Sequence, residues 1–134
     1  MQPAQTWIVV ADGSRARIFE AGRRDRDWRL VESLEHPEGR AHTPELVTDM
    51  PAMESGELPK EREARVFARK VAERLEGGFH ARMFQRLVLV APPEQMGYLR
   101  QALPPPVSAV VAHELTKDFS RLRQDKLEER LPEW

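Results

Sequence analysis

The feature that most constrains this fold is a continuous apolar run near the start of the chain, from Trp7 to Ala11. A strand with one face in water alternates apolar and polar residues, whereas an uninterrupted short run is typical of a strand covered on both faces. Leu87 to Ala91 is a second run of this kind, and Val107 to Ala112, interrupted by Ser108, is a further candidate for a buried strand. The sequence therefore predicts a central sheet with helices on its faces.

The first run continues into an antiparallel meander. Asp12-Gly13 is a strong turn signal, because both residues tolerate the positive φ of a tight hairpin. We expect a second strand from Arg15 to Ala21, followed by the charged turn Arg23 to Asp27. In the third strand, alternation places Trp28, Leu30 and Leu34 on one face and Arg29, Val31 and Ser33 on the other.

The strongest helical pattern begins near Lys60, directly after Pro59. We expect Gly77-Gly78 to end this helix, because glycine takes the left-handed conformation at low cost. The apolar stripe at helical spacing is Ala64, Phe67, Ala68, Val71 and Leu75. The opposite side carries Arg62, Arg65, Arg69 and Glu73, with Glu61–Arg65 and Arg69–Glu73 as expected i,i+4 pairs.

Two shorter helices complete the pattern. One starts near Pro93 and is stopped by the prolines 104–106. The other lies within Ser120 to Leu131, with Leu127 and Leu131 one turn apart. The order along the chain is therefore βββαβαβα, an α/β fold whose mixed sheet is antiparallel on one side and parallel on the other.

The chain has 134 residues and no internal repeat, so we expect a single domain over residues 1–134. Residues 37–59 show no periodicity and contain Pro37, Pro44, Pro51 and Pro59. A loop of this length inside a compact domain is usually functional or disordered. The segment is therefore a candidate for the working part of the protein.

Composition narrows the function classes. Twenty-one basic and 22 acidic side chains nearly cancel, so any surface that binds nucleic acid must be a local one. There is no cysteine, which excludes disulfides, thiolate metal sites and cysteine nucleophiles. The first residues show no signal peptide, and no apolar run is long enough to span a bilayer. We expect a cytoplasmic location.

Four stretches together resemble the bacterial host-attachment protein family, whose name means "required for attachment to host cells". They are TWIVVADGSRARIFE, KEREARVFARKVAERL, LVLVAPPEQMGYLRQAL and VVAHELTKDFSRL, and they cover nearly the whole chain. The most specific parts are the Ala-Asp-Gly turn, the Val-Ala-Pro-Pro strand end with its following Gly-x-Leu-Arg, and Lys117-Asp118. The resemblance implies a ribonuclease H-like fold, similar to the middle domain of archaeal and eukaryotic translation release factors.

In release factors, the loop between the third strand and the long helix carries Gly-Gly-Gln. Residues 37–59 occupy that place here and contain no such motif. The Gly77-Gly78 pair lies at the far end of the helix and is followed by Phe79. The resemblance therefore does not imply hydrolysis of peptidyl-tRNA by the release-factor mechanism.

Candidate metal and catalytic residues have simpler interpretations. Asp12 would be the first-strand acid of a ribonuclease H-like nuclease, but turn chemistry already accounts for it. His36, His42, Glu45 and Asp49 match no established ligand spacing and are better explained by a solvated polar loop. We expect no metal, no cofactor and no catalytic residue, which leaves a hydrolase as an alternative without a recognisable catalytic set.

Binding surfaces are the remaining candidates. The stripe Arg62, Arg65 and Arg69 is either a solvated helix face or a surface that follows a phosphate backbone, to which Arg40 and Lys60 would add. Met50 and Met53 either pack back onto the domain or contact a protein partner. Trp134 either docks on its own domain or anchors a second copy or another partner.

The leading functional hypothesis is a non-catalytic binding module that associates with RNA or the ribosome through the arginine helix and the long loop. The first alternative is a protein-binding adaptor that supports attachment to host cells.

Overall fold

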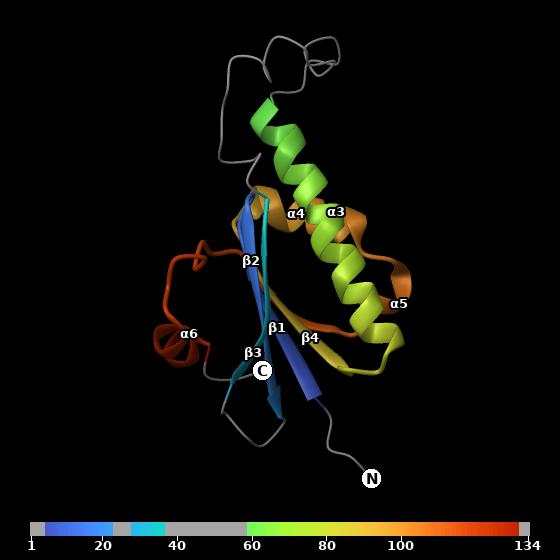
Figure 1. Cartoon of the computed structure of the whole chain (residues 1–134), viewed down its shortest axis with the longest axis vertical. Helices are drawn as coiled ribbons and strands as arrows, with labels where there is room; N and C mark the ends of the chain where they lie inside the picture. Colours follow the sequence, from blue (N-terminus) through green and yellow to red (C-terminus); the bar gives the residue numbers. More distant parts are fainter. Residues whose placement is uncertain (1–4, 23–27, 37–58, 132–134) are drawn as a thin grey trace.

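A computed structural model describes residues 5–22, 28–36 and 59–131 (Figure 1). The expected loop lies outside the described residues except for Pro59, which is the first residue of a helix. The strands are β1 (Gln5–Ala11), β2 (Arg15–Gly22), β3 (Arg29–Glu35), β4 (Arg86–Val90) and β5 (Val111–Leu115). The helices are α3 (Pro59–His80), α4 (Pro93–Ala102), α5 (Pro105–Ser108) and α6 (Gln124–Arg130).

The described strands form one five-stranded sheet in the order β3-β2-β1-β4-β5. β2 is antiparallel to both β1 and β3, whereas β1, β4 and β5 run parallel. This confirms the predicted mixed α/β fold and its order βββαβαβα, to which the structure adds the short α5. β1 lies in the middle of the sheet and is buried from Thr6 to Ala11, as its continuous apolar sequence requires.

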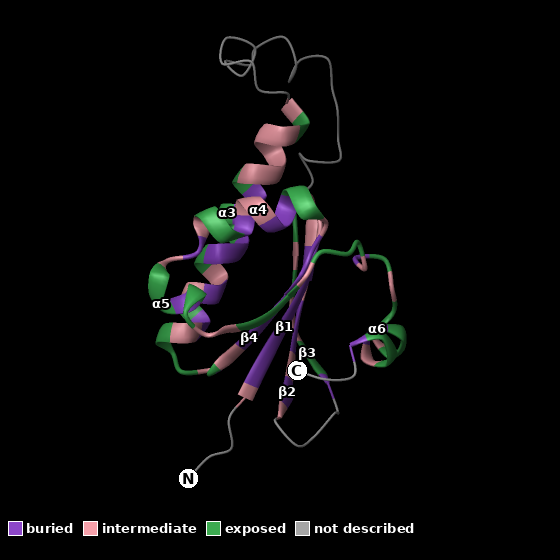
Figure 2. Cartoon of the chain, turned by 180° about the vertical axis from the view of Figure 1, so that it is seen from behind, coloured by how far each residue is buried: buried purple, intermediate pink, exposed green. Residues whose placement is uncertain are grey.

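Each face of the sheet carries a hydrophobic core, because neighbouring side chains of a strand point to opposite faces. On one face Trp7 and Val9 pack against α3 and α4. On the other face Ile8 and Val10 belong to a cluster that includes Leu127 of α6. Figures 1 and 2 show α3, α4 and α5 on one side of the sheet and α6 on the other.

The predicted face assignment of β3 is wrong because the strand is irregular. Phe19 pairs with Leu30 but Ile18 pairs with Glu32, so β3 has one extra residue at this bulge. An extra residue reverses the alternation, and Leu34 therefore packs on the α3 side while Trp28 packs on the α6 side. Leu30 is 48% exposed.

The predicted end of α3 at Gly77-Gly78 is also wrong. The helix continues to His80, and the left-handed residue is Arg82, with φ of 60°. Gly78 has another role, because a Cβ atom built on it would lie 2.6 Å from the Trp7 ring. The glycine lets the helix backbone approach the tryptophan closely.

The last predicted strand, Val107 to Ala112, begins later than expected. Pro105 and Pro106 start the helical turn α5, since proline fits the first positions of a helix, and buried Val107 belongs to that turn. The strand β5 follows at Val111–Leu115 and forms the sheet edge, where its residues are exposed or half-buried. Among the described residues, no helix is long and apolar enough to cross a membrane.

We predict that Gly78→Ala lowers the free energy of unfolding by about 1–3 kcal/mol, because the added methyl group overlaps the Trp7 ring. Gly77→Ala is the matched control, since a Cβ atom there meets nothing within 4 Å. Alanine favours the helix by roughly 0.5–1 kcal/mol over glycine, so this control should gain stability. Urea denaturation measures both variants, and equal stability of the two would contradict the tight packing.

Candidate functional site

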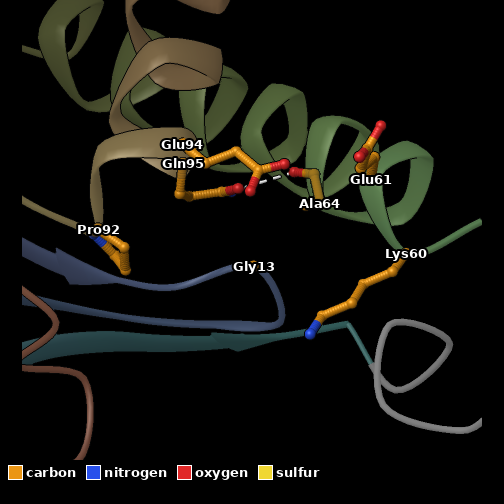
Figure 3. A pocket seen from close by; sticks show the side chains of 7 residues that line it. All are labelled: Gly13, Lys60, Glu61, Ala64, Pro92, Glu94 and Gln95. Carbon is orange, nitrogen blue, oxygen red and sulfur yellow. Dashed lines mark hydrogen bonds between the residues drawn. The ribbon is translucent and has the colours of Figure 1, made fainter. Parts of the chain in front are cut away.

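A pocket of about 290 Å³ opens where β1 and β4 end (Figure 3). The β1–β2 turn, the first turns of α3 and the start of α4 form its walls. In open α/β sheets, ligands usually bind beyond the carboxyl ends of the parallel strands, which is the position of this pocket. The lining residues are Gly13, Lys60, Glu61, Ala64, Pro92, Glu94 and Gln95.

The innermost polar group of this pocket is the Gln95 side chain, which is only 3% exposed. Its Nε2 donates a hydrogen bond to the Ala64 carbonyl oxygen at 3.0 Å, which fixes the orientation of the amide (Figure 3). Its Oε1 is buried and accepts no hydrogen bond from the described residues. The sequence prediction missed Gln95, although a polar residue beside the inward-facing Met96 of α4 was a usable signal.

The ionisable groups around the pocket have opposite charges. Lys60 extends from the first turn of α3 on the sheet side, while Glu94 lies at the start of α4 (Figure 3). Glu61 completes the rim. The mixed charge suits a ligand that carries both donors and acceptors more than a simple anion or cation.

Asp12 closes the β1–β2 turn. Its Oδ1 accepts hydrogen bonds from the Ser14 amide at 2.8 Å and the Arg15 amide at 2.9 Å. These are the bonds of an Asx turn, and they confirm the interpretation of Asp12 as a turn residue. Among the described residues, no group of three or more histidines and acids lies together in a way that could hold a metal ion.

The structure brings the Ala-Asp-Gly turn close to the Lys117-Asp118 segment. The Ser120 hydroxyl donates to Asp118 Oδ1 at 2.7 Å and also lies within reach of Asp12. Since a hydroxyl has one proton, it serves one carboxylate at a time. The sequence prediction did not pair these segments, although each contains Asp-x-Ser with the same local turn bonds.

These contacts set the acidity of Asp12. Burial raises its pKa, but hydrogen bonds from the Ser14 amide, the Ser120 hydroxyl and the Arg15 amide lower it, so the pKa lies below its ordinary value. The ionised form of Asp12 therefore stabilises the turn.

The arginine stripe predicted for nucleic-acid binding, Arg62, Arg65 and Arg69, lies on α3, whose first turns form one wall of this pocket. Arg69 is exposed, and Arg62 and Arg65 are half-buried. Within the described part of the chain, Arg62 and Arg69 form no ion pair, so the expected Arg69–Glu73 pair is absent. Figure 1 shows that the first turns of α3 project beyond the sheet.

Two other cations of α3 hold the helix on β3 instead. The Arg74 guanidinium pairs with Glu32 at 2.5 Å and lies over the Trp7 ring at 5.3 Å. Lys70 Nζ lies 3.5 Å from the Glu35 carbonyl oxygen. Lys70 and Arg74 thus have a structural role that the arginine stripe does not share.

His36 is not part of a solvated loop. Its Nε2 lies 2.5 Å from Glu63 Oε2, its ring stacks on Phe67 at 5.9 Å, and its side chain is 13% exposed. The solvated interpretation is therefore wrong for this residue, which ties the end of β3 to α3. His42, Glu45 and Asp49 lie outside the described residues.

Several other predicted site residues also lie outside the described part of the chain. They are Arg40, Met50, Met53 and Trp134. Lys60 is described, and its place in the wall of the pocket adds it to the candidate site. The roles assigned to all five remain predictions.

We predict that Asp12→Asn reduces the acid sensitivity of the fold. A group with a lowered pKa stabilises the folded state above its unfolded pKa, near 3.8, and loses that effect as the pH falls through the folded pKa. Asparagine keeps the acceptor oxygen but does not titrate. The melting temperature of the wild type should therefore fall more steeply than that of the variant below about pH 4; parallel curves would contradict the role of the charge.

Comparison with known proteins identifies relatives of this chain. Residues 7–131 match the family described as "Protein required for attachment to host cells". A comparison with curated proteins finds no match.

Two solved structures are similar in fold. One, described as "Archaeal protein", has a TM-score of 0.56 and 12% identity over 95% of this chain and 32% of its own. The other, the archaeal translation termination factor aRF1, has a TM-score of 0.53 and 13% identity over 82% of this chain and 29% of its own. This chain thus spans about a third of the length of each, and the likeness confirms the expected release-factor-like fold. The family match, which covers nearly the whole chain, shows that this chain belongs to the family of proteins required for attachment to host cells.

Proposed function

We propose that this protein is a non-catalytic binding module that associates with RNA on the ribosome through the arginine stripe of α3. The observation that carries the proposal is that Arg62 and Arg69 form no ion pair with the described residues. Arg74 on the same helix, by contrast, has a structural role and pairs with Glu32. The unpaired charges are available to an anionic partner.

The shape of the helix supports this proposal. A straight helix rises about 1.5 Å per residue, so Arg62 and Arg69 are separated by about 10 Å along one exposed side. Guanidinium groups in such a row contact successive phosphates and give affinity without reading the base sequence. Val66, which is 38% exposed, lies between them and adds an apolar contact.

The fold likeness supports the ribosome as the setting. One structural neighbour is a translation termination factor. The candidate pocket adjoins the start of α3, where Lys60 adds a positive charge on the sheet side of the helix, away from the stripe. Arg40 would extend the basic surface.

We predict that Arg62→Gln/Arg65→Gln/Arg69→Gln weakens binding to single-stranded RNA and flattens its salt dependence. Each lost phosphate contact lowers the slope of log K against log salt by about 0.7, so loss of three contacts lowers it by about 2. Fluorescence anisotropy at several salt concentrations measures this slope. Arg82→Gln/Arg86→Gln/Lys126→Gln removes the same total charge from other elements and is the matched control.

Cosedimentation with ribosomes tests the setting separately. The wild type and the control should sediment with ribosomes at low salt, and the stripe variant should stay in the supernatant. Equal retention of all three proteins would show that the stripe is an ordinary solvated helix face.

A second candidate function is a protein-binding adaptor that supports attachment to host cells, which the description of the family favours. Met50, Met53 and Trp134 would supply its contacts. Capture of a protein partner that resists salt and is lost on Met50→Ser or Met53→Ser would favour the adaptor over RNA binding.

A further inference from the structure

We propose that a second pocket, on the α6 side of the sheet, binds a phosphate group. The pocket has a volume of about 290 Å³, near the lower limit of roughly 300–1,000 Å³ for small-ligand sites. It lies between the paired strands β2 and β3 and the segment that joins β5 to α6. It shares no lining residue with the pocket of Figure 3, and the proposal does not rest on RNA binding by the arginine stripe.

Four arginines from two distant parts of the sequence line this pocket. Arg15 and Arg17 come from β2, and Arg121 and Arg123 come from the segment before α6. Glu35 is the single acidic residue of its lining. The strong excess of positive charge indicates an anionic ligand.

The carboxylates near this pocket leave much of its charge uncompensated. The Arg15 guanidinium lies 3.9 Å from Asp12 Oδ2, and its buried Nε has no hydrogen-bond acceptor among the described residues. The other Asp12 oxygen is already occupied by the amides of the turn. Arg121 forms no ion pair within the described part of the chain, whereas Arg123 pairs with Asp125 at 3.0 Å.

Arg17 is held at the same place by neutral partners. Its Nη2 donates to the carbonyl oxygens of Ser120 at 3.0 Å and Phe119 at 3.4 Å. Burial and the charge of Arg15 both lower the pKa of Arg17, so the two cations repel each other across a partly dry space. A bound anion would relieve this repulsion.

A phosphate group fits these donors better than a carboxylate does. Guanidinium groups bind phosphate oxygens through pairs of parallel hydrogen bonds, and more than two such groups suit an anion with at least three oxygens. Ser33, which pairs with Arg17 across β2 and β3, adds a hydroxyl donor to the same wall. The ligand is therefore a phosphate ester, a pyrophosphate or a nucleic-acid backbone.

The test is calorimetric titration of the full chain with pyrophosphate at constant ionic strength, with acetate as the carboxylate comparison. Wild-type protein should show saturable binding of pyrophosphate and at least ten-fold weaker binding of acetate. Arg15→Gln/Arg121→Gln should weaken pyrophosphate binding by about ten-fold or more. Amide NMR shifts should change at residues 15–17, 33–35 and 120–123.

The controls separate this proposal from the first one. Arg86→Gln removes a charge elsewhere on the sheet, and Arg69→Gln removes one from the arginine stripe; both should bind pyrophosphate like the wild type. If the double variant is unfolded, Arg121→Gln alone gives the same test, because this side chain makes no hydrogen bond or ion pair with the described residues. Unsaturable binding by the wild type, or unchanged affinity in these variants, would overturn the proposal.

Competition identifies the source of the phosphate. Displacement of pyrophosphate by single-stranded RNA at low salt assigns the site to a nucleic-acid backbone. Displacement by a nucleoside triphosphate but not by RNA assigns it to a small phosphorylated ligand. Either result supports the site. If pyrophosphate, RNA and the nucleoside triphosphate all fail to bind, the proposal is rejected.

Discussion

The close contact between α3 and β1 is the constraint on which the rest of this structure depends. It is made at two points. Gly78 lies against the Trp7 ring, and Gly13 lies so close to Ala64 that a Cβ atom added to the glycine would be 3.2 Å from the Ala64 Cβ atom. Gly13 lies just beyond β1, so Trp7 and Gly13 are at most about 20 Å apart along the chain, and Ala64 and Gly78 are about 21 Å apart along the helix. Because the later residue of α3 contacts the earlier residue of the hairpin, α3 runs antiparallel to β1 between these two points.

Trp7 is also the centre of the contacts that keep α3 in this position. Its ring lies 4.7 Å from Phe84, the Arg74 guanidinium covers it, and its Nε1 donates to Glu20 at 3.3 Å. The cation of α3 that takes part in these contacts is Arg74, which lies on the side of the helix that faces β3. The stripe that contains Arg62 and Arg69 faces away from the sheet, and its charges therefore take no part in docking the helix.

The β1–β2 turn connects the two candidate binding regions. Gly13 lines the pocket beneath α3, while Arg15 and Arg17 extend from the same hairpin into the basic pocket on the opposite face. Asp12 fixes the turn through two amide hydrogen bonds and thereby sets the positions of both walls. Through this hairpin, one end of the sheet carries two surfaces of different charge.

The sequence by itself determined the order of strands and helices along the chain, the buried centre at Trp7–Ala11 and the turn at Asp12, because apolar runs and turn residues act through local geometry. It did not determine the face of Leu34, which depends on a bulge opposite Phe19 and Ile18, or the role of Gly78, which depends on a ring 71 positions away in the chain. It also did not predict that Gln95 lines a pocket or that four arginines line another. Only the tertiary structure brings these residues together, because long-range packing and charge clustering have no periodicity in the sequence.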